Sequence, residues 1–364
     1  MEKGIYFFVG TTAELIKVFP IMQELNKQGV AYKIIASGQN KLDVDILEKT
    51  GIEPISIQLS DKGINQSVFG LLSWFVTTLV KSLFRLKSFF QKDCKNSYLL
   101  VHGDTISTVM GAVIGKLYRL KVVHIEAGLR SFNYFKPFPE EIDRMIVSKL
   151  TDIHCCPNEW SLKNVENKKG LKINTVQNTL LDGLNYALNV NVNSALYDKL
   201  KDKDFFIFVY HRQENLFNEE RMRHIFKKIV NYSRENMTCL LVLHDPTKEA
   251  LLKADLLEKI KKEKSIVTSK RFNYFEFMKL LNAAKFIVTD GGSNQEESYY
   301  FGKPCLILRN ETERNEGLGE NAILSKFDDG IIDYFLSSHE TYQRGFVEVD
   351  VTPSRKIVNA LLSK

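Results

Sequence analysis

The chain has 364 residues, of which 44% are hydrophobic and 26% are charged. These values are typical of a soluble globular protein that is long enough to bury two sizeable cores, and no short-period repeat indicates a solenoid. The formal net charge of +6 fits an anionic small-molecule substrate, an acidic membrane surface or nucleic acid, and charge alone does not choose among them.

The chain opens with a short apolar run, GIYFFVGTT, which includes Gly10. This run is typical of a first buried strand rather than of an export signal. Further apolar runs alternate with longer segments of helical period, which predicts a parallel sheet covered by helices on both faces. The strands expected in the first half of the chain are residues 5–10, 30–38, 97–104, 120–128 and 152–157.

Residues 66–92 form an apolar, aromatic and basic segment before the third of these strands. Its uncharged stretch, residues 67–80, is shorter than the roughly 20 residues that a membrane-spanning helix needs. We expect a helix, or two helices broken near Thr77, that packs with its large aromatics shielded on the first sheet or in a subunit interface. The alternative is an aromatic and basic surface resting on an anionic bilayer. The side chains concerned are Trp74, Phe84, Phe89, Phe90, Lys81, Arg85 and Lys87.

The second half of the chain repeats the alternation, which predicts a second doubly wound domain. Its expected strands are residues 204–211, 238–245, 264–269, 285–292 and 303–308. Because open parallel sheets bind ligands at the carboxyl ends of their strands, we expect the chemistry to lie between the two domains. The side chains and turns at these ends are Gly10, Gly38, Asp104, Glu126, His211, His244 and Asp290.

A glycine-rich turn follows the strand expected at residues 285–292. Gly291, Gly292 and Ser293 let backbone N–H groups approach a ligand, and the N-terminus of the next helix favours a phosphate or diphosphate. The alternative is a turn without a ligand. Glu296 is a candidate to accept the hydroxyl groups of a ribose, and its alternative role is that of an acid near a helix N-terminus.

The cysteines are odd in number and show no metal-ligand spacing, which predicts reduced, buried thiols and a reducing compartment. They are Cys94, Cys155, Cys156, Cys239 and Cys305. We therefore expect the protein in the cytoplasm.

A series of motifs runs through almost the whole chain. They are GTTAELIKVFP at 10–20, VHGDTISTVMGA at 101–112, HIEAGLRS at 124–131, FPEEIDR at 138–144, YHRQEN at 210–215, TDGGSNQEES at 289–298 and FGKPCLILRNETER at 301–314. In this order and spacing they resemble the UDP-N-acetylglucosamine 2-epimerase family. The resemblance implies a GT-B-type α/β fold, in which two Rossmann-like doubly wound domains face each other across a cleft that binds a UDP-sugar. It also implies a homodimer that uses neither a cofactor nor a metal ion.

The expected N-terminal domain, residues 1–172 joined by a C-terminal helix at 352–364, carries the catalytic carboxylates. The expected C-terminal domain, residues 173–351, binds UDP. The resemblance assigns acid and base roles to Asp104, Glu126 and Glu140, and a role at the diphosphate to His211. The UDP-binding residues that it implies are Lys17, Arg212, Phe277, Gly291, Gly292, Ser293, Glu296 and Arg314.

The residues by themselves leave ordinary roles open. Asp104 is a candidate helix cap, Glu140 a first-turn acid and His211 a structural histidine. Phe277 is a candidate core aromatic, whereas the resemblance places an aromatic there in the uracil pocket.

The chain also departs from the family pattern. Thr12 and Ala13 stand where the family has Arg-Pro, so a cation expected near the diphosphate is missing. Gln39 and Asn40 stand where non-hydrolysing members contact a second UDP-N-acetylglucosamine through a Gln-His pair. This difference argues against allosteric activation by the substrate.

We predict an isomerase that inverts C2 of a UDP-2-acetamido sugar by eliminating UDP to a 2-acetamidoglucal and adding it back. Its product would supply a surface polysaccharide such as a capsule or O-antigen. One alternative is a hydrolysing 2-epimerase that releases UDP and the free sugar. The other is a GT-B glycosyltransferase that passes the sugar to a membrane-linked or polysaccharide acceptor. The expected partners are a UDP-sugar and a second copy of the chain, without nucleic acid, and peripheral contact with the inner membrane face through residues 66–92 is left open.

Overall fold

The computed structural model describes residues 4–61, 68–90, 96–134, 139–312 and 314–363. The chain divides into two compact units. The first unit consists of the chain up to Gly183 together with Val349–Lys364, and the second consists of Leu184–Glu348. The domain boundaries expected from the sequence, after residues 172 and 351, stay predictions.

The first unit is built on a seven-stranded sheet in the order β3-β2-β1-β4-β5-β6-β7, and every neighbouring pair is parallel. The strands are β1 (Ile5–Val9), β2 (Lys33–Ala36), β3 (Ile55–Gln58), β4 (Tyr98–His102), β5 (Lys121–Ile125), β6 (Ile153–Cys156) and β7 (Leu171–Asn174). The five strands expected from the sequence are confirmed, and β3 and β7 at the two edges are additional. The strand order reverses between β1 and β4, where open parallel sheets bind their ligands.

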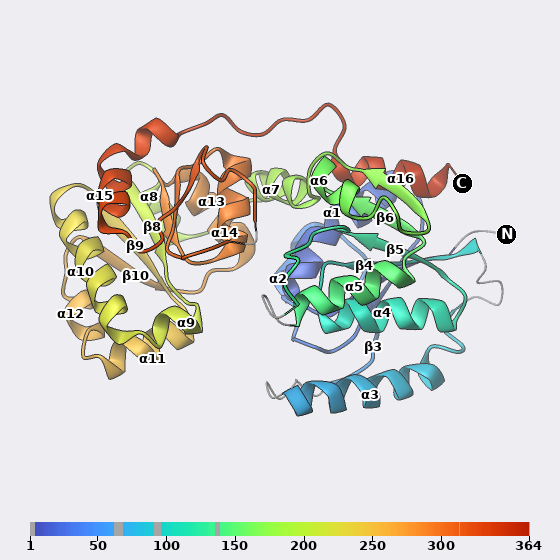
Figure 1. Ribbon diagram of the computed structural model, residues 1–364. Coiled ribbons are helices and arrows are strands. Elements are labelled where there is room, and N and C mark those ends of the chain that lie inside the picture. The colour runs from blue at the N-terminus through green and yellow to red at the C-terminus, as the bar shows by residue number, and fades with distance from the viewer. Residues whose placement is uncertain (1–3, 62–67, 91–95, 135–138, 313, 364) are drawn as a thin grey trace. The chain divides into compact units, whose positions relative to one another are not determined.

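Helices cover both faces of this sheet. They are α1 (Thr12–Lys27), α2 (Val44–Thr50), α3 (Val68–Arg85), α4 (Ile106–Leu117), α5 (Glu140–Leu150), α6 (Glu159–Asn164), α7 (Leu180–Asn189) and α16 (Pro353–Leu362). In Figure 1 the strands of this unit run between α1 with α16 on one side and α4 with α5 on the other. The core beneath α4 contains Tyr6 and Phe8 of β1, Leu99 and Val101 of β4, and Met110 of α4.

Helix α3 packs on this core with one face. Trp74, which is 8% exposed, lies in the core together with Leu86 and Phe90, which follow the end of α3. The prediction of a helix packed on the first sheet is therefore confirmed, and the helix runs through Thr77 without a break. The expectation that all its large aromatics are shielded is wrong for Phe84, which is 79% exposed because it lies on the opposite face.

The exposed face of α3 carries an apolar stripe, here called the outer stripe, with helical spacing. Its members are Leu72, Val76, Val80, Leu83 and Phe84. No helix within the described residues has both the length and the apolar content that crossing a membrane requires.

The second unit is built on a six-stranded parallel sheet in the order β10-β9-β8-β11-β12-β13. The strands are β8 (Phe205–Val209), β9 (Thr238–Leu243), β10 (Ile266–Lys270), β11 (Ile287–Thr289), β12 (Cys305–Ile307) and β13 (Ala322–Leu324). The five strands expected from the sequence are confirmed, and β13 at one edge is additional. Here the strand order reverses between β8 and β11.

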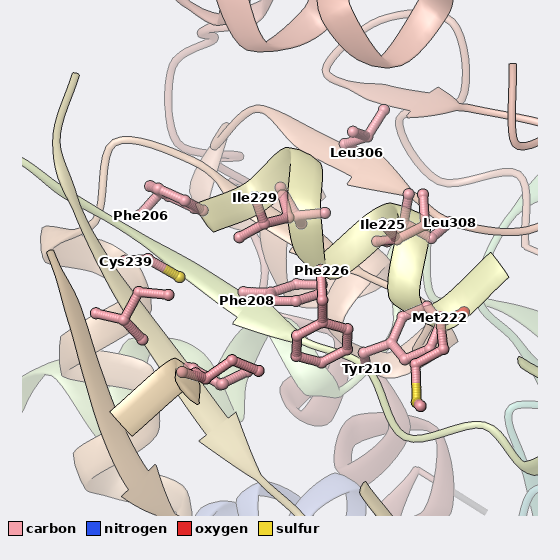
Figure 2. Packing of buried hydrophobic residues seen from close by; sticks show 14 of the residues in the cluster. Phe206, Phe208, Tyr210, Met222, Ile225, Phe226, Ile229, Cys239, Leu306 and Leu308 are labelled. Atoms are coloured by element: carbon pink, nitrogen blue, oxygen red, sulfur yellow. The ribbon is translucent and has the colours of Figure 1, made fainter. Parts of the chain in front are cut away.

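The helices of the second unit also cover both sheet faces. They are α8 (Ala195–Leu200), α9 (Gln213–Leu216), α10 (Glu219–Glu235), α11 (Asp245–Lys253), α12 (Leu257–Lys261), α13 (Tyr274–Ala283), α14 (Gly292–Phe301), α15 (Asp329–Ser338) and the 3₁₀ helix η2 (His339–Tyr342). Figure 2 shows Phe226 and Ile229 of α10 packed in the cluster that contains Phe208 of β8. The rings of Phe208 and Phe226 are 4.9 Å apart, so α10 is fixed on the sheet by aromatic as well as aliphatic contacts.

Candidate active site

Glu126 is the central carboxylate of the first unit. It follows β5 directly, and its φ of 64° lies in the left-handed region, which is strained for a residue with a side chain and is common at functional sites. Lys17 Nζ of α1 lies 2.6 Å from its Oε1, and Asn178 Nδ2 donates to the same oxygen at 2.5 Å. His102 Nε2, at the end of β4, lies 3.4 Å from Oε2. Side chains from three other segments of the chain therefore surround this buried carboxylate.

Asp104 follows β4 and pairs with Arg144 of α5. Arg144 donates to Asp104 Oδ2 from Nε at 2.9 Å and from Nη2 at 2.5 Å. The alternative role of Asp104 as a helix cap is excluded, because Thr105 caps α4 by accepting from the backbone N–H of Thr108 at 3.2 Å. Asp104 is thus joined to α5 and does not cap α4.

Glu140 and Glu141 begin α5 but differ in their surroundings. Glu141 is fully buried and accepts from Arg130 Nε at 2.5 Å and from the Ser131 N–H at 2.9 Å. Burial acts to raise the pKa of Glu141, but the bonds from Ser131 and Arg130 outweigh it and lower the pKa. Glu140 Oε2 is buried and has no hydrogen-bond partner among the described residues. Of the two acids, Glu140 is the one with an oxygen available to a substrate.

Two further buried carboxyl groups were not predicted from the sequence. Glu14 of α1 accepts from the Gly10 N–H at 2.6 Å and from the Thr105 hydroxyl, so it ties the turn after β1 to the turn after β4. Burial raises the pKa of Glu14 to about 7. The pKa of Asp143 on α5 is also raised to about 7, first by burial and then by the charges of neighbouring carboxylates.

Two positions at which the chain departs from the family pattern have structural roles. Thr12 Oγ1 accepts from the Asp43 N–H at 3.1 Å, which fixes the start of α2 against α1. Gln39 Oε1 accepts from the Ser107 hydroxyl at 2.6 Å and from its N–H at 3.2 Å, so this amide binds the first turn of α4.

Asp290 organises the candidate site of the second unit. It follows β11, is fully buried, and accepts from the His211 N–H at 3.0 Å, the Arg212 N–H at 2.9 Å and Asn215 Nδ2 at 3.0 Å. Burial acts to raise the pKa of Asp290, but the bonds from His211 and Asn215 outweigh it and lower the pKa. His211 Nδ1 lies 3.1 Å from Asp290 Oδ1, so the carboxylate orients both its backbone and its ring.

His211 also stacks on His244 with ring centroids 4.7 Å apart. The pKa of His244 is lowered to about 4, first by burial and then by the charges of His211 and Arg271. A neutral imidazole therefore lies against His211 at neutral pH.

The glycine turn leads into α14 beside His211. A Cβ at Gly291 would lie 3.0 Å from His211 Cε1 and 2.9 Å from Asn294 Oδ1, so a larger residue here would require one of these side chains to shift. Gly292 begins α14, and Ser293 is exposed in its first turn. The helix start therefore has the geometry of an anion seat.

Glu296 and Arg314, both predicted to bind UDP, lie close to each other. Arg314 Nη1 is 2.6 Å from Glu296 Oε2, and the glutamate is fully buried. Phe277 lies half-buried on α13, with its ring 6.4 Å from that of Phe272. Arg212 is half-buried, and its Nη1 lies 3.2 Å from Glu214 Oε1.

Each unit thus assembles its own set of predicted residues at the carboxyl ends of its strands. The first unit brings together Lys17, Asp104, Glu126 and Glu140, and the second brings together His211, Arg212, Gly291, Gly292 and Ser293. No group of three or more His, Cys, Asp or Glu side chains in the described part of the chain is arranged to hold a metal ion.

Two parallel sheets, each wound with helices on both faces, make this an α/β protein of the GT-B type. A profile of the UDP-N-acetylglucosamine 2-epimerase family matches residues 23–333. The UDP-N-acetylglucosamine 2-epimerase of Methanocaldococcus jannaschii is 30% identical over 319 residues, which cover 85% of this chain and 84% of that protein. The enzyme of that name from Bacillus subtilis is 31% identical over 323 residues, which cover 85% and 79%.

Solved structures give the same result. UDP-GlcNAc 2-epimerase from Neisseria meningitidis, bound to UDP-GlcNAc, has a TM-score of 0.80 and 26% identity, and the match covers 100% of both chains. The structure from Methanocaldococcus jannaschii has a TM-score of 0.79 with 26% identity and the same coverage. The chain belongs to the UDP-N-acetylglucosamine 2-epimerase family, which confirms the resemblance seen in the sequence.

Proposed function

We propose that the protein is a UDP-N-acetylglucosamine 2-epimerase, an isomerase that inverts C2 of a UDP-2-acetamido sugar. The observation that carries this proposal is the placement of Asp104, Glu126 and Glu140 at the carboxyl ends of β4 and β5 and the start of α5. Membership of the family supports it, as do related structures described as bound to UDP-GlcNAc or UDP.

The proposed reaction has two halves. In the first half a carboxylate takes the C2 proton, a double bond forms between C1 and C2, and UDP leaves with the electron pair of the C1–O bond. In the second half UDP adds back to C1 while a carboxylic acid delivers a proton to the other face of C2. Such a weakly acidic C–H bond needs a positioned base, and a departing diphosphate needs cationic or N–H partners.

The carboxylates of the first unit suit different parts of this reaction. Glu126 is held by Lys17 and Asp104 by Arg144, so both are fixed in position by cations. Glu140 has a buried oxygen without a hydrogen-bond partner among the described residues. We therefore assign removal of the C2 proton in the first half of the reaction to Glu140. Asp104 and Glu126 complete the acid and base set.

The second unit supplies groups suited to the nucleotide. The helix start at Gly292 offers N–H groups and a positive partial charge to a diphosphate. His211, oriented by Asp290, is the candidate that assists the leaving oxygen. We assign Glu296 to the ribose and Phe277 to the uracil on the strength of the family resemblance.

The reaction is tested by incubating the purified chain with UDP-N-acetylglucosamine in deuterated water and following it by proton NMR. Deuterium at C2 of a UDP-sugar epimer is the expected result. Free 2-acetamido sugar with UDP would instead identify a hydrolysing 2-epimerase. An unchanged substrate would contradict both and favour a glycosyltransferase, which needs an acceptor.

We further propose a homodimer in which the outer stripe of α3 is covered by a second copy. The stripe is apolar over several turns, and apolar surface of this extent marks interaction sites. Basic residues lie in the last turns of α3, at Lys81 and Arg85, and just after it, at Lys87. This arrangement also fits an anionic bilayer. Sedimentation should give a dimer for the wild type and a monomer for Val76→Asp, whereas salt-sensitive pelleting of the wild type with anionic vesicles would favour the membrane.

The proposed setting is the cytoplasm, in the synthesis of a surface polysaccharide precursor. This setting is the one that the family resemblance implies. The described cysteines, Cys155, Cys156, Cys239 and Cys305, are buried free thiols, as expected in a reducing compartment.

A further inference from the structure

Asp143 lies three residues after Glu140 on α5, so the two side chains share one face of the helix. Asp143 is 4% exposed, and its Oδ2 is buried without a hydrogen-bond partner among the described residues. Glu140 Oε2 is in the same condition. Because a buried polar atom without a partner costs free energy, two such oxygens on one helix face mark a place that accommodates a proton or a ligand group.

The arginines nearby are directed at other carboxylates. Arg144 donates both of its short bonds to Asp104, and its Nη1 lies 3.4 Å from Glu141. Arg130 donates to Glu141 at 2.5 Å. With Glu140 and Asp143 added, the neighbourhood contains two arginines and four carboxyl groups, three in the first turn of α5 and one, Asp104, after β4. A largely buried site with this balance favours keeping a proton on one of the acids.

The pKa of Asp143 is raised to about 7, first by burial and then by the charges of Asp104 and Glu140, against the effect of Arg144. Helix α4 and strand β5 pack against α5. Their titratable side chains are Lys116, paired with Asp152, Lys121, placed over the ring of Tyr98, and His124, whose pKa burial lowers to about 4. Among the described residues of α4 and β5, no cation is therefore placed to keep Asp143 ionised.

We propose that Asp143 is a positioning residue of the proposed epimerase reaction, which keeps one proton beside Glu140 and restores the protonation state of Glu140 during each turnover. The inference rests on the function proposed above. It adds to the acid and base set a residue that the motif resemblance does not assign.

The proton balance of the reaction creates a need for such a residue. Elimination places the C2 proton on a carboxylate, and re-addition takes a proton from an acid on the other face of C2. After one inversion, one carboxyl group has gained a proton and another has lost one. Asp143 can take up the proton that Glu140 has gained and pass it on to the carboxyl group that has lost one, because its buried oxygen lies on the helix face of Glu140 and has no hydrogen-bond partner among the described residues. No proton is consumed overall, and no further reactant is needed.

The test compares the wild type with Asp143→Asn by NMR in water and in deuterated water between pH 6 and 8.5. The amide keeps the shape of the side chain but cannot hold a transferable proton. We expect wild-type turnover to fall as the pH rises through about 7, because Asp143 then loses its proton. In Asp143→Asn the turnover should drop about 10- to 100-fold at pH 7, the lower part of the range for acid–base groups, and this pH step should vanish.

Asp182→Asn is the matched control. Asp182 belongs to the same unit and has a pKa raised to about 6 by burial, but it accepts from the Ser354 N–H and does not adjoin Glu140. This control should retain both turnover and the pH step. The affinity of Asp143→Asn for UDP, measured by calorimetry, should stay within about two-fold of the wild type. Urea denaturation should give a free energy of unfolding no lower than that of the wild type, which shows that the first unit of the variant is folded.

Two results would overturn the inference. If Asp143→Asn binds UDP and keeps the wild-type pH profile, Asp143 has only a structural role while the epimerase function stands. If the wild type shows no exchange at C2 at any pH, the proposed function falls, and the role of Asp143 falls with it.

Discussion

Lys17 Nζ lies 2.6 Å from Glu126 Oε1, although the two residues are 109 positions apart in the chain. The contact joins α1, which follows β1, to the turn after β5, and both groups are largely buried. One ion pair therefore spans the point at which the strand order reverses. It sets the position of the carboxylate that the motifs single out.

We expect Lys17→Met to destabilise the first unit by about 3–5 kcal/mol, because it leaves Glu126 buried without its cation. Lys17→Met combined with Glu126→Gln should recover much of this loss. Lys116→Met is the control, since the Lys116–Asp152 pair is 37% exposed on both sides and should contribute less than about 1 kcal/mol. The measurement is urea denaturation at neutral pH, and equal losses for the two lysines would contradict the argument.

Glu140→Gln and Glu126→Gln should each abolish deuterium incorporation at C2 while UDP still binds. The amide preserves the shape of each side chain but does not accept a proton from carbon. Exchange is followed by NMR and UDP affinity by calorimetry. Glu141→Gln is a useful comparison, because Glu141 is bound to Arg130 and Ser131 and its loss should act mainly through stability. Normal exchange in Glu140→Gln would remove that residue from the mechanism.

The strands that could be predicted from the sequence are those in the middle of each sheet and one edge strand, β10. Strands such as β1 and β8 are buried throughout and read as unbroken apolar runs. The three that were missed, β3, β7 and β13, each lie at the edge of a sheet. Their residues are short runs that are mostly half-buried or partly exposed, so their sequences carry no continuous apolar signal.

The sequence motifs predicted the central residues of the candidate site but not the partners that hold them. Asp104 and Glu126 stand at strand ends that the alternation marks, but their partners Arg144 and Asn178 are joined to them only by tertiary contacts. Glu14 begins as an ordinary helix signal, since T-x-x-E at Thr11 is the pattern of a capping box. Its carboxylate also binds the Gly10 N–H and the Thr105 hydroxyl, and the second of these contacts depends on the fold.

Glu296→Ala should weaken UDP binding by about 1–3 kcal/mol, the usual scale for hydrogen bonds to a charged acceptor. The structure adds a second cause, because Glu296 Oε2 lies 2.6 Å from Arg314 Nη1 and its loss disturbs that arginine. A double-mutant cycle with Arg314→Met separates the two effects by calorimetry. Strong coupling indicates that the pair acts as one unit, whereas unchanged UDP affinity in Glu296→Ala would return Glu296 to a purely structural role.

Trp74→Ser and Phe84→Ser, both on α3, should differ greatly in their effect on stability. Trp74 is buried in the first core, so its loss should cost about 3–5 kcal/mol. Phe84 is 79% exposed in the outer stripe, so its replacement should change the free energy of unfolding of the monomer by less than about 0.5 kcal/mol. Denaturation at low protein concentration measures both. A large loss in Phe84→Ser under these conditions would show that the outer face is packed within the monomer.

Between pH 6.5 and 8 the free energy of unfolding should fall as the pH rises. The pKa values of Glu14 and Asp143 are raised to about 7 in the folded chain, above the ordinary values of 4.5 and 3.8. A raised folded-state pKa gives stability that is fully present below the unfolded-state value and is lost as the pH passes through the folded-state value. Over this window each group should account for about 1 kcal/mol. His124 and His244 offset part of this fall. Their pKa values are lowered to about 4, so both are neutral in the folded chain throughout, whereas the unfolded chain releases the protons of these rings over the same range, which adds back about 0.4 kcal/mol for each.

Guanidinium denaturation of the wild type, Glu14→Gln and Asp143→Asn at pH 6.5 and pH 8 measures these contributions. Each single variant should remove about 1 kcal/mol of the fall between these two pH values, because it removes one of the two titrating carboxyl groups. Asp143→Asn should also be more stable than the wild type at pH 8, since it removes a buried carboxylate whose Oδ2 has no hydrogen-bond partner among the described residues. Glu14→Gln should gain less, because the amide accepts only one of the two bonds from Gly10 and Thr105. If Glu14→Gln and Asp143→Asn both keep the pH dependence of the wild type, neither carboxyl group keeps its proton near neutral pH.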